Sequence, residues 1–166
     1  MACQQEPQRI FLHVKKRSAR LPMQKRSLSF VVERYRGSQV RVFALDRDAL
    51  LHALRKRARE LIENNPDVAA VWLVGSLARD EAKPGSDADI VVFMRSSSVP
   101  FLQRIPELSR CFSGLGVACE VRAYTLEEWE RLRADGARVV RALEREGVVL
   151  ASGESELPDR TCATTT

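Results

Sequence analysis

The residues most able to do chemistry lie in one stretch of the chain, residues 71–94, which reads VWLVGSLARDEAKPGSDADIVVFM. An apolar segment ends just before Gly75 and Ser76, and ten residues separate this pair from Asp87 and Asp89. The two aspartates lead directly into a second apolar segment. Because alternate side chains of an extended chain share a face, both carboxylates are expected to point the same way.

Two neighbouring carboxylates repel each other unless a cation lies between them, so this pair predicts a divalent metal site. Mg²⁺ is the natural ion, because it binds oxygen and commonly takes one or two carboxylates together with substrate phosphates. Gly75 allows the backbone to approach a ligand closely. Ser76 offers a hydroxyl and an amide to a phosphate. Each motif alone is typical of surface turns, so the prediction depends on their combination between two buried strands.

A third acid, Glu120, lies about thirty residues further on, inside the apolar segment 117–121. An acid among apolar neighbours needs a partner, because burial of an unpaired charge is costly. Two arrangements are open. Glu120 either pairs with a base such as Arg122 or joins the two aspartates at the metal.

Short apolar segments must position these groups. VAAVWLV at 68–74, IVVFM at 90–94 and VACEV at 117–121 predict three buried strands, and VVL at 148–150 predicts an edge strand. Helices are predicted between and after them. The clearest helix start is the capping box formed by Thr125 and the glutamate three residues later. The sum is an α+β or α/β domain with three or four strands.

The composition fits one globular domain and excludes several other classes. The chain has 166 residues, of which 45% are hydrophobic and 30% charged, so it can bury a core. No apolar run reaches the roughly 20 residues that a membrane-spanning helix needs. The four cysteines include no CxxC pair, which argues against a zinc site or a disulfide framework. The N-terminus lacks the apolar core of a secretory signal, so a reducing cytoplasm is expected.

The positive charge is concentrated at the start of the chain. Residues 1–42 carry ten Lys and Arg against two Glu, whereas the remaining residues carry 17 Lys and Arg against 20 acids. We therefore expect a basic N-terminal extension over 1–44, partly disordered or a small hairpin, that is dispensable for the chemistry. A domain over 45–150 and a disordered tail over 151–166 follow. A nucleic-acid-binding arm is the alternative interpretation of the extension.

The pattern of Gly-Ser, ten residues and Asp-x-Asp resembles the GS-x10-DxD motif of the nucleotidyltransferase superfamily that includes DNA polymerase β. LAR-x-EA at 77–82 is similar to that family's sequence after the Gly-Ser pair. So is EVRAYTLEEWERL from Glu120, where the family has an acid, apolar strand residues and a capped helix. The resemblance covers roughly residues 45–150, and the short chain is similar to the minimal nucleotidyltransferases.

This resemblance implies an enzyme with an α+β fold, in which helices flank a mixed sheet of three to four strands. It implies two Mg²⁺ ions held by Asp87, Asp89 and Glu120, which are also the catalytic residues. Gly75 and Ser76 would bind the triphosphate of an NTP, with ATP the first candidate. The reaction would transfer a nucleoside monophosphate to a hydroxyl of a protein or small-molecule acceptor and release pyrophosphate.

The resemblance also bears on partners. Many minimal nucleotidyltransferases are antitoxin-type partners of small helical HEPN-domain proteins, which implies a partner of that kind or a second copy of this chain. A second class of function stays open: a weakly active or inactive module of the same fold that binds and neutralises a helical partner. A nucleic acid is the less favoured partner, and no membrane partner is expected.

Two positions depart from the family's usual pattern. Asp80 stands where the family usually has Gly, which is expected to alter a tight turn and to add negative charge near the phosphates. Glu120 stands where the family more often has Asp, and the longer side chain must still meet the demanding geometry of Mg²⁺.

Arg79 and Lys83 are either phosphate contacts or solvated loop charges.

Overall fold

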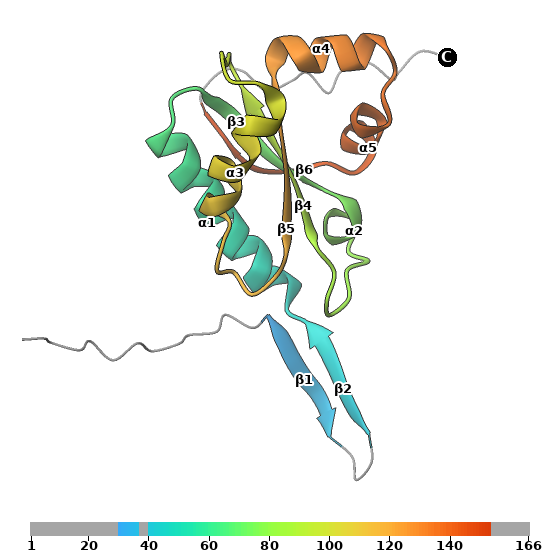
Figure 1. The fold of residues 1–166 in the computed structure, drawn as a ribbon. Helices are drawn as coiled ribbons and strands as arrows, with labels where there is room; N and C mark the ends of the chain where they lie inside the picture. Colours follow the sequence, from blue (N-terminus) through green and yellow to red (C-terminus); the bar gives the residue numbers. More distant parts are fainter. Residues whose placement is uncertain (1–29, 37–39, 154–166) are drawn as a thin grey trace, which may run out of the picture.

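The computed structural model describes residues 30–36 and 40–153, which form a two-stranded hairpin and a four-stranded sheet with helices (Figure 1). In chain order the elements are β1 (Val31–Arg36), β2 (Arg41–Leu45), α1 (Arg47–Asn64), β3 (Val68–Val74), α2 (Gly75–Ala78), β4 (Ala88–Met94), α3 (Phe101–Cys111), β5 (Cys119–Thr125), α4 (Leu126–Ala134), α5 (Arg138–Glu146) and β6 (Val148–Ser152). Most of the predicted extension and nearly all of the predicted tail lie outside the described residues.

The four-stranded sheet has the order β5-β4-β3-β6 and is mixed. β4 pairs in parallel with β5 and antiparallel with β3, and β6 pairs antiparallel with β3 at the edge. This topology confirms the predicted α+β fold, a mixed sheet with flanking helices.

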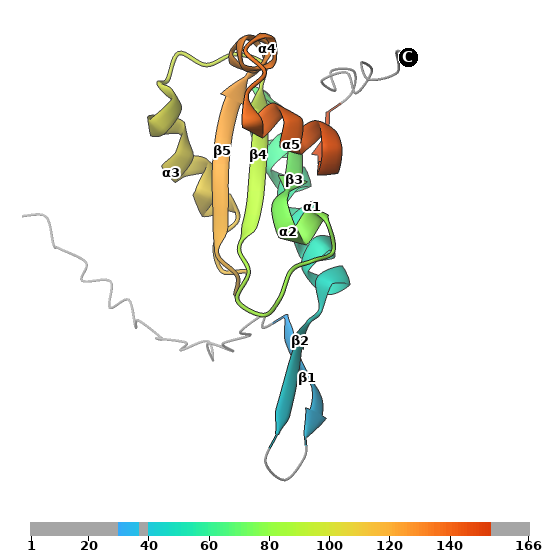
Figure 2. The same ribbon diagram turned by 90° about the vertical axis from the view of Figure 1, so that its right-hand side faces the viewer.

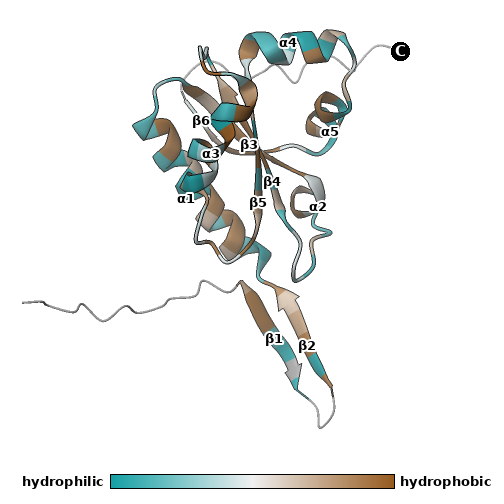
Figure 3. Cartoon of the chain, viewed as in Figure 1, coloured by the Kyte–Doolittle hydropathy of each residue, from teal (hydrophilic) through white to brown (hydrophobic). Residues whose placement is uncertain are grey.

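Helices cover both faces of this sheet (Figure 2). α1 and α3 pack on one face, in a buried cluster that includes Leu54, Ile90 and Leu108. α5 packs on the other face, in a cluster that includes Trp72 and Leu143. The central strands are hydrophobic along their length, as strands buried on both faces must be (Figure 3).

The predicted boundaries of three strands are wrong. β6 continues two residues beyond the predicted edge strand at 148–150. β4 begins two residues before the predicted strand at 90–94, so Asp89 lies inside it. β5 begins and ends later than the predicted strand at 117–121. Its buried residues, Val121 and Ala123, alternate with partly exposed polar and aromatic ones. A half-buried strand of this kind is marked by alternation, not by a continuous apolar run.

Side chains cap the starts of α1 and α4. The Asp46 side chain accepts a hydrogen bond from the amide of Ala49 at 3.1 Å and caps α1. Thr125 and Glu128 make both bonds of the capping box at the start of α4, which confirms that prediction. Since Thr125 also ends β5, strand and helix meet there without a loop.

The hairpin of β1 and β2 extends away from the sheet (Figure 1). Phe30, just before β1, is nevertheless buried in the same cluster as α1 and the sheet. Its carbonyl accepts a hydrogen bond from the amide of Asp46 at 2.5 Å. A domain that begins at residue 45 therefore lacks one core side chain.

Candidate active site

The sheet brings the predicted site residues together at one end of its strands. Asp89 is the register partner of Val74 in antiparallel β3 and of Glu120 in parallel β5. Because Gly75 follows Val74 directly, the ends of three strands place Gly75, Asp89 and Glu120 side by side. Asp87 is exposed, two residues before Asp89.

Gly75 and Asp89 are in direct contact. Gly75 has a φ of +79°, which side chains rarely adopt. A Cβ atom at this position would lie 2.2 Å from Asp89 Oδ2. Only glycine, at this φ, allows the backbone and the Asp89 carboxylate to approach so closely. The predicted approach of a ligand to Gly75 stays a prediction.

Burial raises the pKa of two groups at this end of the strands, Asp89 and Cys119. Burial raises the pKa of Asp89 above its ordinary value, and the negative charges of Glu120 and Asp87 raise it further, while Arg122 acts in the opposite direction. Burial raises the pKa of the Cys119 thiol to about 11, and Asp87 contributes to that shift as well. Cys119 is therefore protonated at neutral pH and is no nucleophile.

Glu120 adopts the first of its two open arrangements. Arg122 Nη2 lies 2.5 Å from Glu120 Oε1 and 3.9 Å from Asp89 Oδ1. Within the described ranges, no group of three or more His, Cys, Asp or Glu side chains is placed to hold a metal ion. Asp87 and Asp89 fit a Mg²⁺ ion that takes its other ligands from phosphates, because that ion often binds through only one or two carboxylates.

An acid that the sequence analysis missed lies at the predicted phosphate site. Glu146, the last residue of α5, accepts hydrogen bonds on Oε1 from the Gly75 amide at 3.4 Å and from Arg79 Nη1 at 2.8 Å. Its side chain is only 7% exposed. Burial acts to raise the pKa of Glu146, but the bonds from Arg79 and Arg145 outweigh it and the net shift is downward.

The turn after α2 is intact despite the aspartate at position 80. Asp80 has a φ of +64°, in the left-handed region where glycine is usual. Its carboxylate pairs with Arg47 Nε at 3.1 Å, and Arg47 also donates to the carbonyls of Leu77 and Ala78. The extra negative charge is therefore paired with Arg47.

The other candidate phosphate contacts differ in their distance from the Gly75 amide. Arg79 donates to Glu146 beside the Gly75 amide and to Glu81 at 2.7 Å. Ser76 is half-buried at the start of α2, next to the same amide. Lys83 is exposed, and its amide donates to Ser86 Oγ in the loop before β4.

Two comparisons with known proteins concern the sequence of the chain. The nucleotidyltransferase domain family matches residues 54–144, more than half of the chain. None of the curated proteins compared with the chain matches it.

Several solved structures are similar to this chain. A candidate nucleotidyltransferase from Sulfolobus solfataricus is 20% identical over 65% of this chain and 85% of its own, with a TM-score of 0.48. A toxin-antitoxin structure with AMP-PNP is 20% identical over 60% of this chain and 74% of its own, with a TM-score of 0.44. A tri-AMPylated Shewanella oneidensis HEPN toxin in complex with MNT antitoxin is 16% identical over 65% and 74%, with a TM-score of 0.35.

No helix in the part of the chain that the structure describes is long and apolar enough to cross a membrane. The family match spans the glycine-serine turn, both aspartates and Glu120. The chain belongs to the nucleotidyltransferase domain family.

Proposed function

We propose that this chain is a Mg²⁺-dependent nucleotidyltransferase that transfers a nucleoside monophosphate, with AMP from ATP as the first candidate, to a hydroxyl of a protein or small-molecule acceptor. The observation that carries the proposal is the contact of Gly75 with Asp89, where a Cβ atom would lie 2.2 Å from the carboxylate. Family membership supplies the reaction class.

Asp87 and Asp89 would hold the metal. Burial, together with smaller contributions from Glu120 and Asp87, raises the pKa of Asp89, and a bound cation would stabilise the ionised carboxylate. Mg²⁺ in this position supplies Lewis-acid stabilisation of the phosphoryl oxygens and of the leaving group. Glu120 would approach a second ion or take a proton.

The transfer itself needs one nucleophile and one leaving group. The acceptor hydroxyl oxygen bonds to the α-phosphorus of the NTP, and the bond from that phosphorus to the α–β bridging oxygen breaks. Pyrophosphate leaves with the electron pair of the broken bond. The proton of the hydroxyl passes to Glu120, which can accept it while paired with Arg122, because a carboxylate has several acceptor positions.

The amide of Gly75 and the hydroxyl of Ser76 would bind the triphosphate together with Arg79. In the structure Glu146 takes up two of these donors, the amide and the guanidinium. The triphosphate would displace the Glu146 carboxylate, since both are anions that need the same groups.

The proposed partner is a small helical protein of the HEPN type or a second copy of this chain. The support is the resemblance of the short chain to minimal nucleotidyltransferases, many of which pair with such proteins. The acceptor hydroxyl would then belong to that partner or to a small molecule.

A second function, a module of this fold that binds a helical partner without catalysis, is favoured by the state of two acids. Glu120 is engaged by Arg122, and Glu146 takes up the amide of Gly75. Replacement of Glu120 by Gln separates the two functions. If the chain is an enzyme, Glu120→Gln reduces the rate of transfer at least about 10²-fold, on the scale of a lost acid–base group. If the chain is a binding module, the variant keeps its affinity for the partner.

Calorimetry with Mg²⁺-ATP tests the proposed site. The double variant Asp87→Ala/Asp89→Ala is expected to lose metal-dependent ATP binding while it keeps its circular dichroism spectrum. Glu63→Ala, which removes an exposed acid from α1, serves as the matched control and should bind as the wild type does. Unchanged Mg²⁺-ATP affinity in the double variant would contradict the assignment of Asp87 and Asp89 as metal ligands. Incubation with labelled ATP, Mg²⁺ and a small all-helical protein encoded by a neighbouring gene tests the acceptor.

A further inference from the structure

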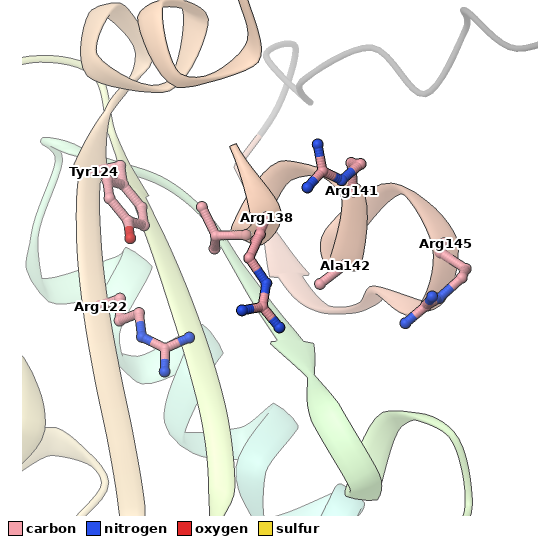
Figure 4. A pocket seen from close by; sticks show the side chains of 7 residues that line it. Arg122, Tyr124, Arg138, Arg141, Ala142 and Arg145 are labelled. Atoms are coloured by element: carbon pink, nitrogen blue, oxygen red, sulfur yellow. The ribbon is translucent and has the colours of Figure 1, made fainter. Parts of the chain in front are cut away.

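A cavity of about 580 Å³ lies between β5 and α5 (Figure 4). Its lining includes Arg122, Tyr124, Arg138, Arg141, Ala142 and Arg145. In Figure 4 the guanidinium groups of Arg122 and Arg138 point into the space between the two elements. Four arginines line the cavity, with no aspartate or glutamate in its lining. Arg122 and Arg145 pair with Glu120 and Glu146 outside the lining, so the net positive charge of the cavity comes from Arg138 and Arg141.

The sequence of α5 builds the cationic wall. Arg138, Arg141 and Arg145 are spaced by three and four residues, which puts them on one face of the helix. The opposite face carries the buried residues Val140 and Leu143, so the helix is anchored in the core and presents its arginines outward. The small side chain of Ala142, between these arginines, leaves room inside the cavity.

The fold itself leaves part of this charge uncompensated. Arg138 makes no hydrogen bond or ion pair with any residue in the described ranges, and Arg141 donates to the carbonyl of Gly136. Like charges on one helix face repel each other. The cluster is therefore better explained by an anionic ligand than by its contribution to stability.

Arg122 connects the cavity to the carboxylates of the candidate active site. The same guanidinium that lines the cavity lies 2.5 Å from Glu120 and 3.9 Å from Asp89. Glu120 and Asp89 are register partners on adjacent parallel strands. A ligand bound in the cavity would therefore extend directly to the place where the proposed transfer occurs.

We propose, on the basis of the transferase function proposed above, that this cavity binds the acceptor substrate through a phosphate group that the acceptor carries. A phosphate monoester has three terminal oxygens and up to two charges, so it can engage several guanidinium groups at once, and arginine binds it in bidentate fashion. A single carboxylate would satisfy one arginine. The volume lies in the range of pockets for small molecules, roughly 300–1,000 Å³.

The phosphate acts as a handle and does not react. Held by Arg138 and Arg141, it would leave the rest of the acceptor free to reach across Arg122 toward Glu120. The phenol oxygen of Tyr124 faces the same space in Figure 4 and can donate a further hydrogen bond to a phosphate oxygen. The acceptor hydroxyl would then lie beside the carboxylates of Glu120 and Asp89.

Titration with inorganic phosphate in the presence of EDTA, followed by NMR, tests this site without metal or NTP. Arg138→Gln/Arg141→Gln is expected to weaken phosphate binding at least tenfold. Arg55→Gln/Arg59→Gln removes the same charge from exposed positions of α1 and should leave binding within twofold of the wild type. Ala142→Leu fills the cavity without a change in charge and should also weaken binding, while circular dichroism checks the fold of each variant.

Mg²⁺-ATP binding, phosphate binding by the variants and a carboxylate competitor distinguish an acceptor site from other sites. If Arg138→Gln/Arg141→Gln keeps its Mg²⁺-ATP affinity within twofold of the wild type, the cavity is an acceptor site. If the variant loses ATP binding and phosphate binding equally, the proposal is overturned, because the cavity would then hold the NTP. Unchanged phosphate binding in that variant, or binding of hexaglutamate but not of phosphate, would also overturn it. Asp87→Ala/Asp89→Ala should keep phosphate binding in EDTA, so a failure of the metal site is distinguishable from a failure of this cavity.

Discussion

Glu146 holds the two groups that an incoming triphosphate would need, the amide of Gly75 and the guanidinium of Arg79. Replacement of Glu146 by Gln removes the negative charge that competes with the phosphates. We therefore expect Glu146→Gln to bind Mg²⁺-ATP more tightly, by about three- to tenfold, which corresponds to roughly one charge-assisted hydrogen bond gained by the ligand. Calorimetry measures this change.

Glu144 provides the matched control. It lies on the same helix, is exposed, and its nearest base is Arg133 at 3.7 Å. Glu144→Gln should leave ATP affinity unaltered. Weaker ATP binding in Glu146→Gln would show that the acid supports the phosphate site and does not compete for it.

Single residues differ in how far the sequence alone could predict their roles. The contact of Gly75 with Asp89 could be anticipated, because the motif spacing puts both residues at strand ends. Glu146 could not, since it meets Gly75 across 71 residues through the packing of α5. The pairing of Glu120 was one of two open arrangements, because only the structure places Arg122 Nη2 within 2.5 Å.

At the scale of elements, β3 was predicted well because it is buried on both faces. β3 is apolar at every position, which no surface segment tolerates, and its predicted bounds are confirmed. The predicted bounds of β5 were wrong, because Arg122 and Tyr124, which are partly exposed, interrupt the apolar run. These two residues line the cationic cavity, so the error in the strand's bounds falls on the proposed acceptor site.

The junction of β5 with α4 depends on a buried arginine that the sequence analysis did not identify. Arg104 of α3, whose side chain is 6% exposed, donates to both carboxylate oxygens of Glu128 at 2.7 and 2.9 Å. The bonds from Arg104 lower the pKa of Glu128 below its ordinary value, against the opposing effect of burial. Glu128 also completes the capping box with Thr125.

We expect Glu128→Gln to reduce the free energy of unfolding by about 2 kcal/mol at neutral pH, because it leaves a buried arginine without its counter-charge. Gln preserves the capping-box bond, so the loss reports the ion pair. Since the folded-state pKa of Glu128 lies below the unfolded one, the pair stabilises the fold above the ordinary pKa of 4.5. That contribution disappears as the pH falls through the lowered pKa.

Urea denaturation of the wild type and the variant near pH 7 and near pH 3 measures this dependence, and the difference between the two proteins should shrink at the lower pH. Glu127→Gln is the control, because Glu127 pairs with Arg131 on the surface with a 75% exposed side chain and should change stability little. An equal difference at both pH values would contradict the assignment.

At the scale of the whole molecule, the site is assembled from distant segments at one edge of the sheet. The Gly-Ser turn after β3, the aspartates at β4, Glu120 on β5 and the end of α5 all meet there. α5 reaches this edge because its apolar face packs on β3. The same packing orients its arginines toward β5, so one helix links the proposed phosphate site to the proposed acceptor site.

The N-terminal boundary of the folded unit stays a prediction, and the position of Phe30 bears on it. Charge distribution alone predicts that the extension is dispensable and that a chain starting near Val40 keeps its stability. The burial of Phe30, which is 7% exposed and packs in the core cluster, argues against that expectation. Removal of β1 would also take away the pairing partner of β2.

We expect Phe30→Ala to lower the free energy of unfolding by about 2–4 kcal/mol, because it deletes a large side chain from a packed core and leaves a cavity. Val42→Ala, on the same hairpin but 45% exposed, is the control and should cost much less.

A chain beginning at Val40 should unfold at a lower temperature than one beginning at Phe30, and thermal unfolding followed by circular dichroism compares them. Mg²⁺-ATP binding of both chains at a temperature where each is folded should be equal, because Phe30 lies in the cluster on the sheet face opposite α5. Equal melting temperatures would place the start of the folded unit after the hairpin, as the charge distribution predicted.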